Sequence, residues 1–134
     1  MHYLLVPVQP RWDSPQDLFG FYNYIEHRYK ATELSRALVQ MERFNREPYW
    51  GGKDKSLSDR MLLVLLDEMN LARVEYYFSE FLSKLETRRD IGDINKGHLR
   101  RKAELVFEMG ALRKNENQAR VFPDNNILFV GTMN

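Results

Sequence analysis

The chain has 134 residues, and its 20 lysines and arginines nearly balance its 19 aspartates and glutamates. This length is typical of one domain that can bury a core, and the balanced charge gives no overall sign of a nucleic-acid or membrane partner. The absence of cysteine excludes disulfides and thiolate metal sites, and no apolar run approaches the ~18 residues of a membrane span. We therefore expect one cytoplasmic domain, residues 1–134, without a membrane partner.

The first third of the chain predicts a strand followed by two helices. Residues 3–8 form an apolar run, and Pro7 favours an edge position because proline cannot donate to a ladder. Ser14 and Pro15 favour a short helix that ends near Gly20, and an aromatic-rich connection follows. Apolar residues at three- and four-residue spacing then predict a helix over residues 32–44. Residues 45–59 have the composition of a loop, either solvated or in contact with a partner.

The centre of the chain is a continuous apolar run, residues 61–66, followed directly by Asp67 and Glu68. Such a run predicts a strand of a parallel sheet that is covered on both faces. An amphipathic helix is expected from about residue 71 to 86, which makes half of a βαβ unit. The two carboxylates therefore lie where open α/β sheets bind ligands.

The last third predicts an insertion and a final strand. Residues 103–108 partly alternate and residues 119–122 could return as a second strand, so we interpret residues 87–126 as an insertion that bears a β-hairpin. Residues 127–130 form another apolar strand, followed by Gly131-Thr132-Met133-Asn134.

The carboxyl ends of neighbouring parallel strands meet at one edge, so we expect Asn134 to lie beside Asp67 and Glu68. A carboxylate pair and a neutral amide suit a metal–phosphate site with a positioned water. The alternative is that the acidic residues only stabilise a helix N-terminus, by ~0.3–1 kcal/mol.

Two segments carry a family resemblance. LLVLLDEMNLA, with the helix after it, and ILFVGTMN resemble the Walker B and sensor-1 segments of AAA+ NTPases. They are most similar to the McrB-like restriction GTPases and their MoxR and dynein relatives, and VPVQPRWDSPQDLFGFYN resembles the second-strand segment of the same group. The resemblance implies an α/β fold, a partial P-loop NTPase core with three αβα layers. Of the sheet order 5-1-4-3-2, this chain would supply strands 2, 3 and 4, with Walker B at 61–68 and sensor 1 at 127–134.

The resemblance also implies roles for the residues at the strand ends, with Mg²⁺ and ATP or GTP as ligands of the intact protein. Asp67 would coordinate Mg²⁺, mostly through water, and Glu68 would act as general base toward the attacking water. Asn134 would sense the γ-phosphate, with Thr132 as the alternative. These roles make Glu68 and Asn134 the candidate catalytic residues.

Asn70 and Arg73 belong to the same DEMN-type signature, in which a role at a subunit contact is implied. For Arg73 the alternative is an ion pair with Glu75 or Glu80 on a solvated helix face, worth under ~1 kcal/mol.

In one branch of AAA+ proteins the insertion before sensor 1 carries a hairpin that contacts DNA or polypeptide in the pore of the ring. The insertion here is locally basic, which suits phosphate contacts. The alternative is a solvated surface whose charge is offset by nearby acidic residues. The candidate DNA-contacting residues are Arg88, Arg89, Arg100, Arg101 and Lys102.

The chain departs from the family at the phosphate-binding loop. No G-x-x-x-x-G-K-[ST] sequence occurs, and Gly51-Gly52-Lys53-Asp54 lacks both the spacing and the hydroxyl. We therefore expect an internal part of an AAA+ module that is inactive alone, with its P-loop upstream of Met1. The strand at 127–130 would then expose an apolar edge, which predicts self-association through strand pairing.

Two other functions stay open. A non-catalytic interaction module with P-loop-type topology is favoured by the missing phosphate-binding loop, and a P-loop encoded in frame upstream would exclude it. A metal-dependent phosphoesterase is disfavoured, because His2, His27 and His98 are scattered without ligand spacing.

Overall fold

The computed structural model describes residues 2–42, 44, 59–108 and 118–133. Its central element is a three-stranded parallel sheet of β1 (His2–Pro7), β4 (Leu62–Asp67) and β7 (Ile127–Gly131), in the order β1-β4-β7. The three strands, their parallel direction and their order agree with the prediction, and β1 lies at an edge as Pro7 indicated.

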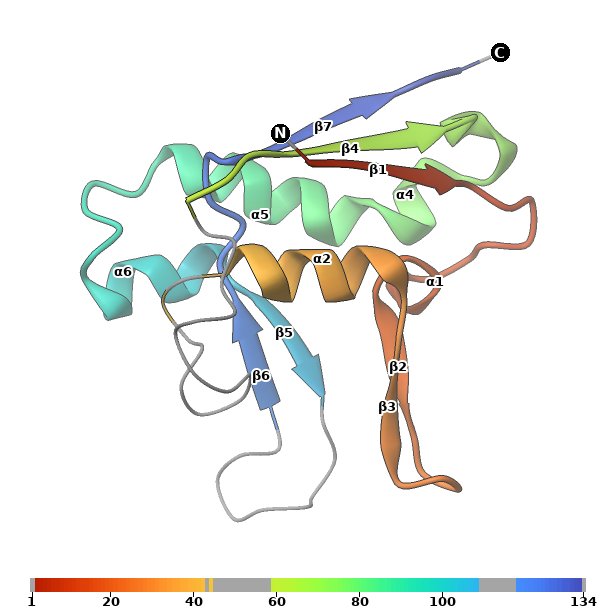
Figure 1. Ribbon diagram of the computed structural model, residues 1–134, viewed down its shortest axis with the longest axis horizontal. Coiled ribbons are helices and arrows are strands. Elements are labelled where there is room, and N and C mark those ends of the chain that lie inside the picture. Colours follow the sequence, from red (N-terminus) through yellow and green to blue (C-terminus); the bar gives the residue numbers. More distant parts are fainter. Residues whose placement is uncertain (1, 43, 45–58, 109–117, 134) are drawn as a thin grey trace.

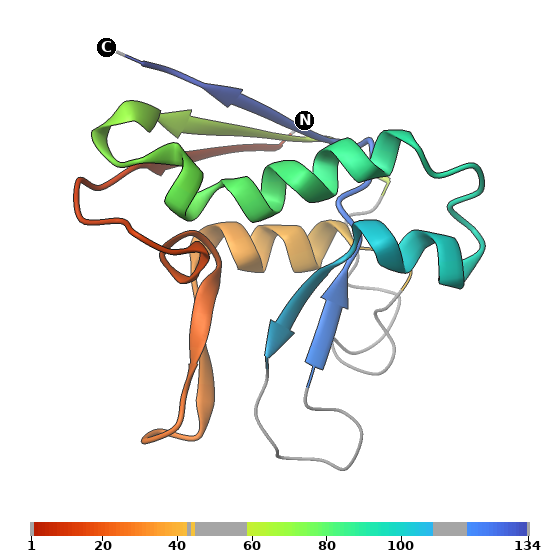
Figure 2. The same ribbon diagram turned by 180° about the vertical axis from the view of Figure 1, so that it is seen from behind.

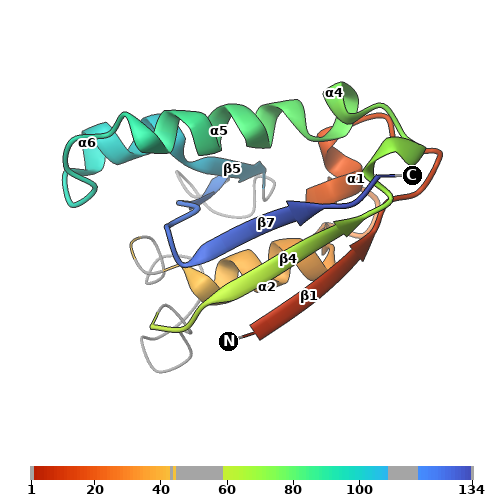
Figure 3. The ribbon, with the colours of Figure 1, turned by 90° about the horizontal axis from the view of Figure 1, so that it is seen from above.

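The helices cover one face of this sheet (Figures 1 and 3). Alternate side chains of β4 point into that face, where Leu62, Val64 and Leu66 are buried. The covering helices are α1 (Pro15–Phe19), α2 (Glu33–Met41), α4 (Val74–Tyr77) and α5 (Ser79–Arg89).

The opposite face of the sheet is not covered by any helix of the described residues. Tyr3 and Leu5 of β1 are 60% and 45% exposed, and Leu128 and Val130 of β7 are 45% and 49% exposed. The expected three-layer arrangement is therefore wrong for the described part of the chain. The physical reason is the strand order: it advances in one direction, and right-handed crossovers that advance in one direction place their helices on the same face.

The predicted helix over residues 71–86 is divided. A 3-10 turn, η2 (Met69–Leu71), is followed by α4, a break at Phe78, and α5, which extends to Arg89. Leu71, which lies in η2, and Leu82 of α5 are exposed, whereas Tyr77 of α4 is fully buried, so the buried side chains differ in part from the predicted apolar stripe. The Tyr77 hydroxyl donates to the Met69 carbonyl at 2.8 Å, which explains why this tyrosine can lie in the core.

Helix α2 begins where the sequence indicated and ends earlier. Thr32 caps it, accepting from the Ser35 backbone N–H at 3.1 Å. The helix ends at Met41 because Glu42, which is 1% exposed, turns its carboxylate to the backbone N–H groups of Phe44 and Phe122.

Two antiparallel hairpins project away from the sheet, on the far side of the helices (Figures 1 and 2). Strands β5 (Leu105–Glu108) and β6 (Gln118–Val121) form the hairpin expected in the insertion, which also contains α6 (Gly97–Arg100) and the 3-10 turn η3 (Arg101–Ala103). The other hairpin, β2 (Gly20–Asn23) with β3 (Arg28–Ala31), was not predicted.

The helices and the sheet share an aromatic core. Phe81 of α5 is fully buried, and its ring packs edge-to-face with three others. The ring centroids lie 4.6 Å from Phe129 of β7, 5.1 Å from Phe19 of α1 and 5.6 Å from Phe78. Phe81 therefore joins the sheet to two of the helices that cover it.

Candidate site at the strand ends

Asp67 and Thr132 lie together at the carboxyl edge of the sheet, where β4 and β7 end side by side (Figure 3). The Thr132 hydroxyl donates to Asp67 Oδ1 at 2.8 Å, and its Oγ1 atom accepts from the Glu68 backbone N–H, also at 2.8 Å. On the backbone, the Thr132 N–H donates to the Leu66 carbonyl and the Met69 N–H donates to the Thr132 carbonyl. The predicted meeting of these two strand ends is therefore observed for Asp67, Glu68 and Thr132.

Glu68 has an unusual backbone conformation. Its φ of 54° and ψ of 53° lie in the left-handed region, which costs a residue with a side chain ~1–2 kcal/mol. The two hydrogen bonds that Thr132 makes with residues 68 and 69 hold it there. Strain of this kind concentrates at functional sites, where the surrounding structure enforces it.

Gly131 leaves room for the Met69 side chain at the same corner. A Cβ atom at this position would lie 1.9 Å from the Met69 sulfur, far inside van der Waals contact. Glycine therefore lets Met69 lie against the end of β7, directly after the strained residue.

The donor set of the corner fits Mg²⁺ that is shared with a phosphate. Among the described residues no group of three or more histidine, cysteine, aspartate or glutamate side chains could hold a metal ion. Mg²⁺ is usually held by one or two carboxylates, with water and substrate phosphate completing the octahedron. Asp67 and Glu68 supply that number of carboxylates.

The other residues predicted for this site are placed differently. Asn134 lies outside the described residues, so its position beside Asp67 stays a prediction. Asn70 is exposed in η2. Arg73 donates to the Tyr76 hydroxyl at 3.0 Å, and its guanidinium carbon lies 5.4 Å from the centroid of that ring. Arg73 therefore makes a local surface contact, with a tyrosine rather than with the glutamates that the sequence suggested.

Two of the five basic residues predicted to contact DNA are engaged within the protein. Arg88 donates to the carbonyls of Pro123 and Asp124, both at 2.8 Å, and burial lowers the pKa of its guanidinium while nearby Asp124 opposes that shift.

Arg100 is the second engaged residue. It donates to Glu104 Oε2 at 3.1 Å and to the Ile94 carbonyl at 3.0 Å, and its guanidinium carbon lies 4.2 Å from the centroid of the Phe44 ring. Its side chain is 12% exposed. The residues that remain exposed for a phosphate contact are Arg89, Arg101 and Lys102.

Comparison with protein-family models, with curated proteins and with solved structures finds no match to this chain. No helix among the described residues has the length and apolar character needed to cross a membrane. The motifs at residues 61–70 and 127–134 and the geometry of the strand ends are therefore the features that indicate a function.

The sequence predicted Thr132 only as an alternative to Asn134 and did not indicate its part in joining the strand ends. It is the residue that joins the two strand ends, since one hydroxyl serves both Asp67 and the Glu68 backbone. The available signal was a hydroxyl residue two positions after an apolar strand, opposite an acidic residue on the neighbouring strand.

Replacing Glu68 with asparagine should raise the free energy of unfolding by about 0.5–1 kcal/mol, because asparagine tolerates the left-handed conformation better than glutamate. Urea denaturation would measure the change. Glu75→Asn, at an exposed position of α4, is the control and should lower stability by a few tenths of a kcal/mol through helix propensity. A loss of stability in both variants would contradict the strain at Glu68.

Proposed function

We propose that the corner formed by Asp67, Glu68 and Thr132 binds the metal and activates the water in the nucleotide site of an AAA+ NTPase of the McrB-like type. The proposed reaction is hydrolysis of ATP or GTP, in a cytoplasmic ring that acts on DNA in restriction or remodelling. The observation that supports it best is the bond network at the strand ends, in which Thr132 fixes Asp67 and holds Glu68 in a strained conformation. The DEMN and GTMN motifs of the same two strand ends support it independently.

Asp67 is suited to holding a hydrated cation. The Thr132 hydroxyl occupies one acceptor position of Oδ1 at 2.8 Å and restrains the carboxylate, and the remaining acceptor positions can receive hydrogen bonds from metal-bound water. Mg²⁺, when bound, would neutralise the charge that develops on the phosphates.

Glu68 is suited to accepting a proton from water. Successive side chains of a regular strand point to opposite faces, but the left-handed conformation of Glu68 ends β4 at Asp67. Glu68 follows β4 directly, at the same carboxyl end of the strand as Asp67. A carboxylate at this edge can act as general base toward the water that attacks the γ-phosphate.

The proposal does not extend to binding of the phosphate chain by these residues. The 134 residues contain no G-x-x-x-x-G-K-[ST] sequence, so no residue of this chain is assigned to cradling the phosphates. DNA contact is proposed for Arg89, Arg101 and Lys102, which are exposed in the described structure and can neutralise backbone phosphates.

Paramagnetic Mn²⁺ tests the corner directly, because it replaces Mg²⁺ and broadens nearby amide signals in NMR spectra. Titration with Mn²⁺, alone and with ATP or GTP, should broaden the signals of residues 66–69 and 131–133 before others. The Asp67→Asn/Glu68→Gln variant should reduce this broadening at least five-fold. The control variant Glu86→Gln/Asp90→Asn alters two exposed carboxylates on and just after α5 and should leave it unchanged. Broadening centred elsewhere, or unaffected by the first variant, would overturn the proposal.

We also propose that copies of the chain associate through the outer edge of β7. Within the described residues β7 pairs only with β4, and an open strand with exposed apolar side chains recruits further strands. Val130→Lys should shift the protein toward a monomer, measured by size-exclusion chromatography with light scattering. Tyr24→Lys adds the same charge at an exposed position between β2 and β3 and should not. A wild-type protein that is a monodisperse monomer at high concentration would contradict the proposal.

A further inference from the structure

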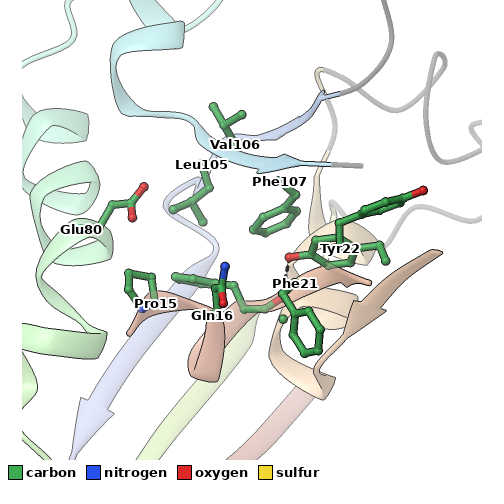
Figure 4. A pocket seen from close by; sticks show the side chains of 11 residues that line it. Pro15, Gln16, Phe21, Tyr22, Glu80, Leu105, Val106 and Phe107 are labelled. Carbon is green, nitrogen blue, oxygen red and sulfur yellow. Dashed lines mark hydrogen bonds between the residues drawn. The ribbon is translucent and has the colours of Figure 1, made fainter. Parts of the chain in front are cut away.

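A hollow of about 170 Å³ lies between α1, α5, the β2–β3 hairpin and β5 (Figure 4). It includes none of the residues assigned to the strand-end corner. Apolar and aromatic side chains make up most of its wall. The aromatic residues that line it are Phe19, Phe21, Tyr22, Tyr29 and Phe107.

The wall is held in place by contacts within the protein. The Phe107 ring centroid lies 5.9 Å from that of Phe19 and 5.8 Å from that of Tyr29. The Tyr29 hydroxyl donates to the Phe19 carbonyl at 2.9 Å. Burial raises the pKa of Tyr29 to about 12, so it stays a neutral donor. A ligand would therefore meet a preformed surface, which lowers the entropy cost of binding.

One charged side chain, Glu80, faces this hollow. Among the residues that line it, Glu80 is the only one of a type that is charged at neutral pH. Figure 4 shows it extending from α5 toward the space beneath Leu105. Its carboxylate is exposed, and among the described residues it has no ion pair or hydrogen bond. A lone carboxylate beside aromatic rings attracts a cation, since ring faces and carboxylate both favour positive charge.

A second hollow of about 330 Å³ shares Tyr29 and Phe107 with the first. Ala31, Val39 and the exposed Arg36 contribute to its lining. The two hollows together offer room for more than one residue of a ligand, which favours an extended polypeptide over a small free amine.

We propose that the hollow at Glu80 binds a lysine or arginine side chain presented by a partner polypeptide. The aliphatic stem of such a side chain lies against Leu105 and Phe107, and its charged group meets the Glu80 carboxylate at the rim. Long basic side chains suit this site because they bury apolar stems while the charge stays near water. The neighbouring hollow receives the adjoining residues of the partner.

Two blocked amino acids test the charge requirement. N-acetyl-lysine methylamide and N-acetyl-norleucine methylamide have the same stem, and only the first carries an ammonium group. In NMR titrations the lysine compound should shift the amide signals of residues 16–22 and 105–107, with a dissociation constant at least five-fold lower than that of norleucine. Equal binding of the two compounds, or shifts confined to other residues, would overturn the proposal.

Glu80→Gln should remove the difference between the two compounds. Glu86→Gln, an exposed glutamate of the same helix that does not line the hollow, should preserve it. A preference for lysine that survives in Glu80→Gln would overturn the role of that carboxylate.

A blocked Ala-Ala-Lys-Ala-Ala peptide tests the polypeptide assignment. It should bind more tightly than the single lysine compound and should also shift the signals of residues 36–40. If only the amide signals of residues at the first hollow shift, the assignment of a polypeptide ligand would be overturned.

Discussion

Replacing Gly20 with alanine should lower the free energy of unfolding by about 3 kcal/mol or more, the range of severe backbone strain. Gly20 has φ 91° and ψ −176°, a region essentially restricted to glycine. A Cβ atom there would also lie 2.1 Å from the Lys30 carbonyl oxygen. That oxygen belongs to the backbone of β3, so relief of the clash requires the two strands of the hairpin to separate.

Urea denaturation would measure the loss, and amide exchange of residues 20–31 would show whether the β2–β3 pairing opens. Gly92→Ala is the matched control, because a Cβ atom at that position has no neighbour within 4 Å. Its effect should stay within about 0.5 kcal/mol, as is usual for surface substitutions. Equal effects of the two changes would contradict the observed conformation of Gly20.

Replacing Phe81 with alanine should lower the free energy of unfolding by about 3–5 kcal/mol, the usual cost of removing a buried phenylalanine. The side chain is fully buried. Its ring contacts aromatic rings of α1 and β7 at centroid distances of 5.1 and 4.6 Å. The cavity would therefore open where helices and sheet meet, and the neighbouring rings would lose packing partners.

The measurement is again the midpoint of urea unfolding, with near-ultraviolet circular dichroism to report the packing of the remaining aromatic rings. Leu82→Ala is the control on the same helix, since Leu82 is 43% exposed and should cost under about 1 kcal/mol. A similar loss in both variants would show that the packing of α5 differs from that described.

The strands of the sheet could be predicted because each is an apolar run bounded by polar or turn residues. Each predicted strand begins and ends within one residue of β1, β4 or β7. The hairpin of β5 and β6 was predicted from partial alternation. The β2–β3 hairpin was missed because its start depends on Gly20 at positive φ, and its turn on the Asn23 side chain, which accepts from the backbone of residues 25 and 26.

The candidate site could be predicted in part. The proximity of Asp67 to Thr132 follows from the rule that parallel strands end at one edge. The left-handed conformation of Glu68 could not be predicted, because a hydroxyl 64 residues further along the chain enforces it. Charge patterns likewise predicted the DNA-contacting residues only in part. Arg88 and Arg100 were predicted to contact DNA from the surface, whereas in the structure they donate to backbone carbonyls.

The bond between Arg88 and the carbonyls of Pro123 and Asp124 closes the base of the insertion. Arg88 lies near the end of α5, and the two carbonyls lie just before β7, so the entry and the exit of this long excursion are fastened together. Leu105, Phe107 and Val121 of this excursion are buried in the same hydrophobic core as Val64 and Leu66 of β4, so its two strands cannot be exchanged without changing the packing of the domain. The insertion is therefore an integral part of the core, and the Arg88 contact fixes both of its ends beside the sheet.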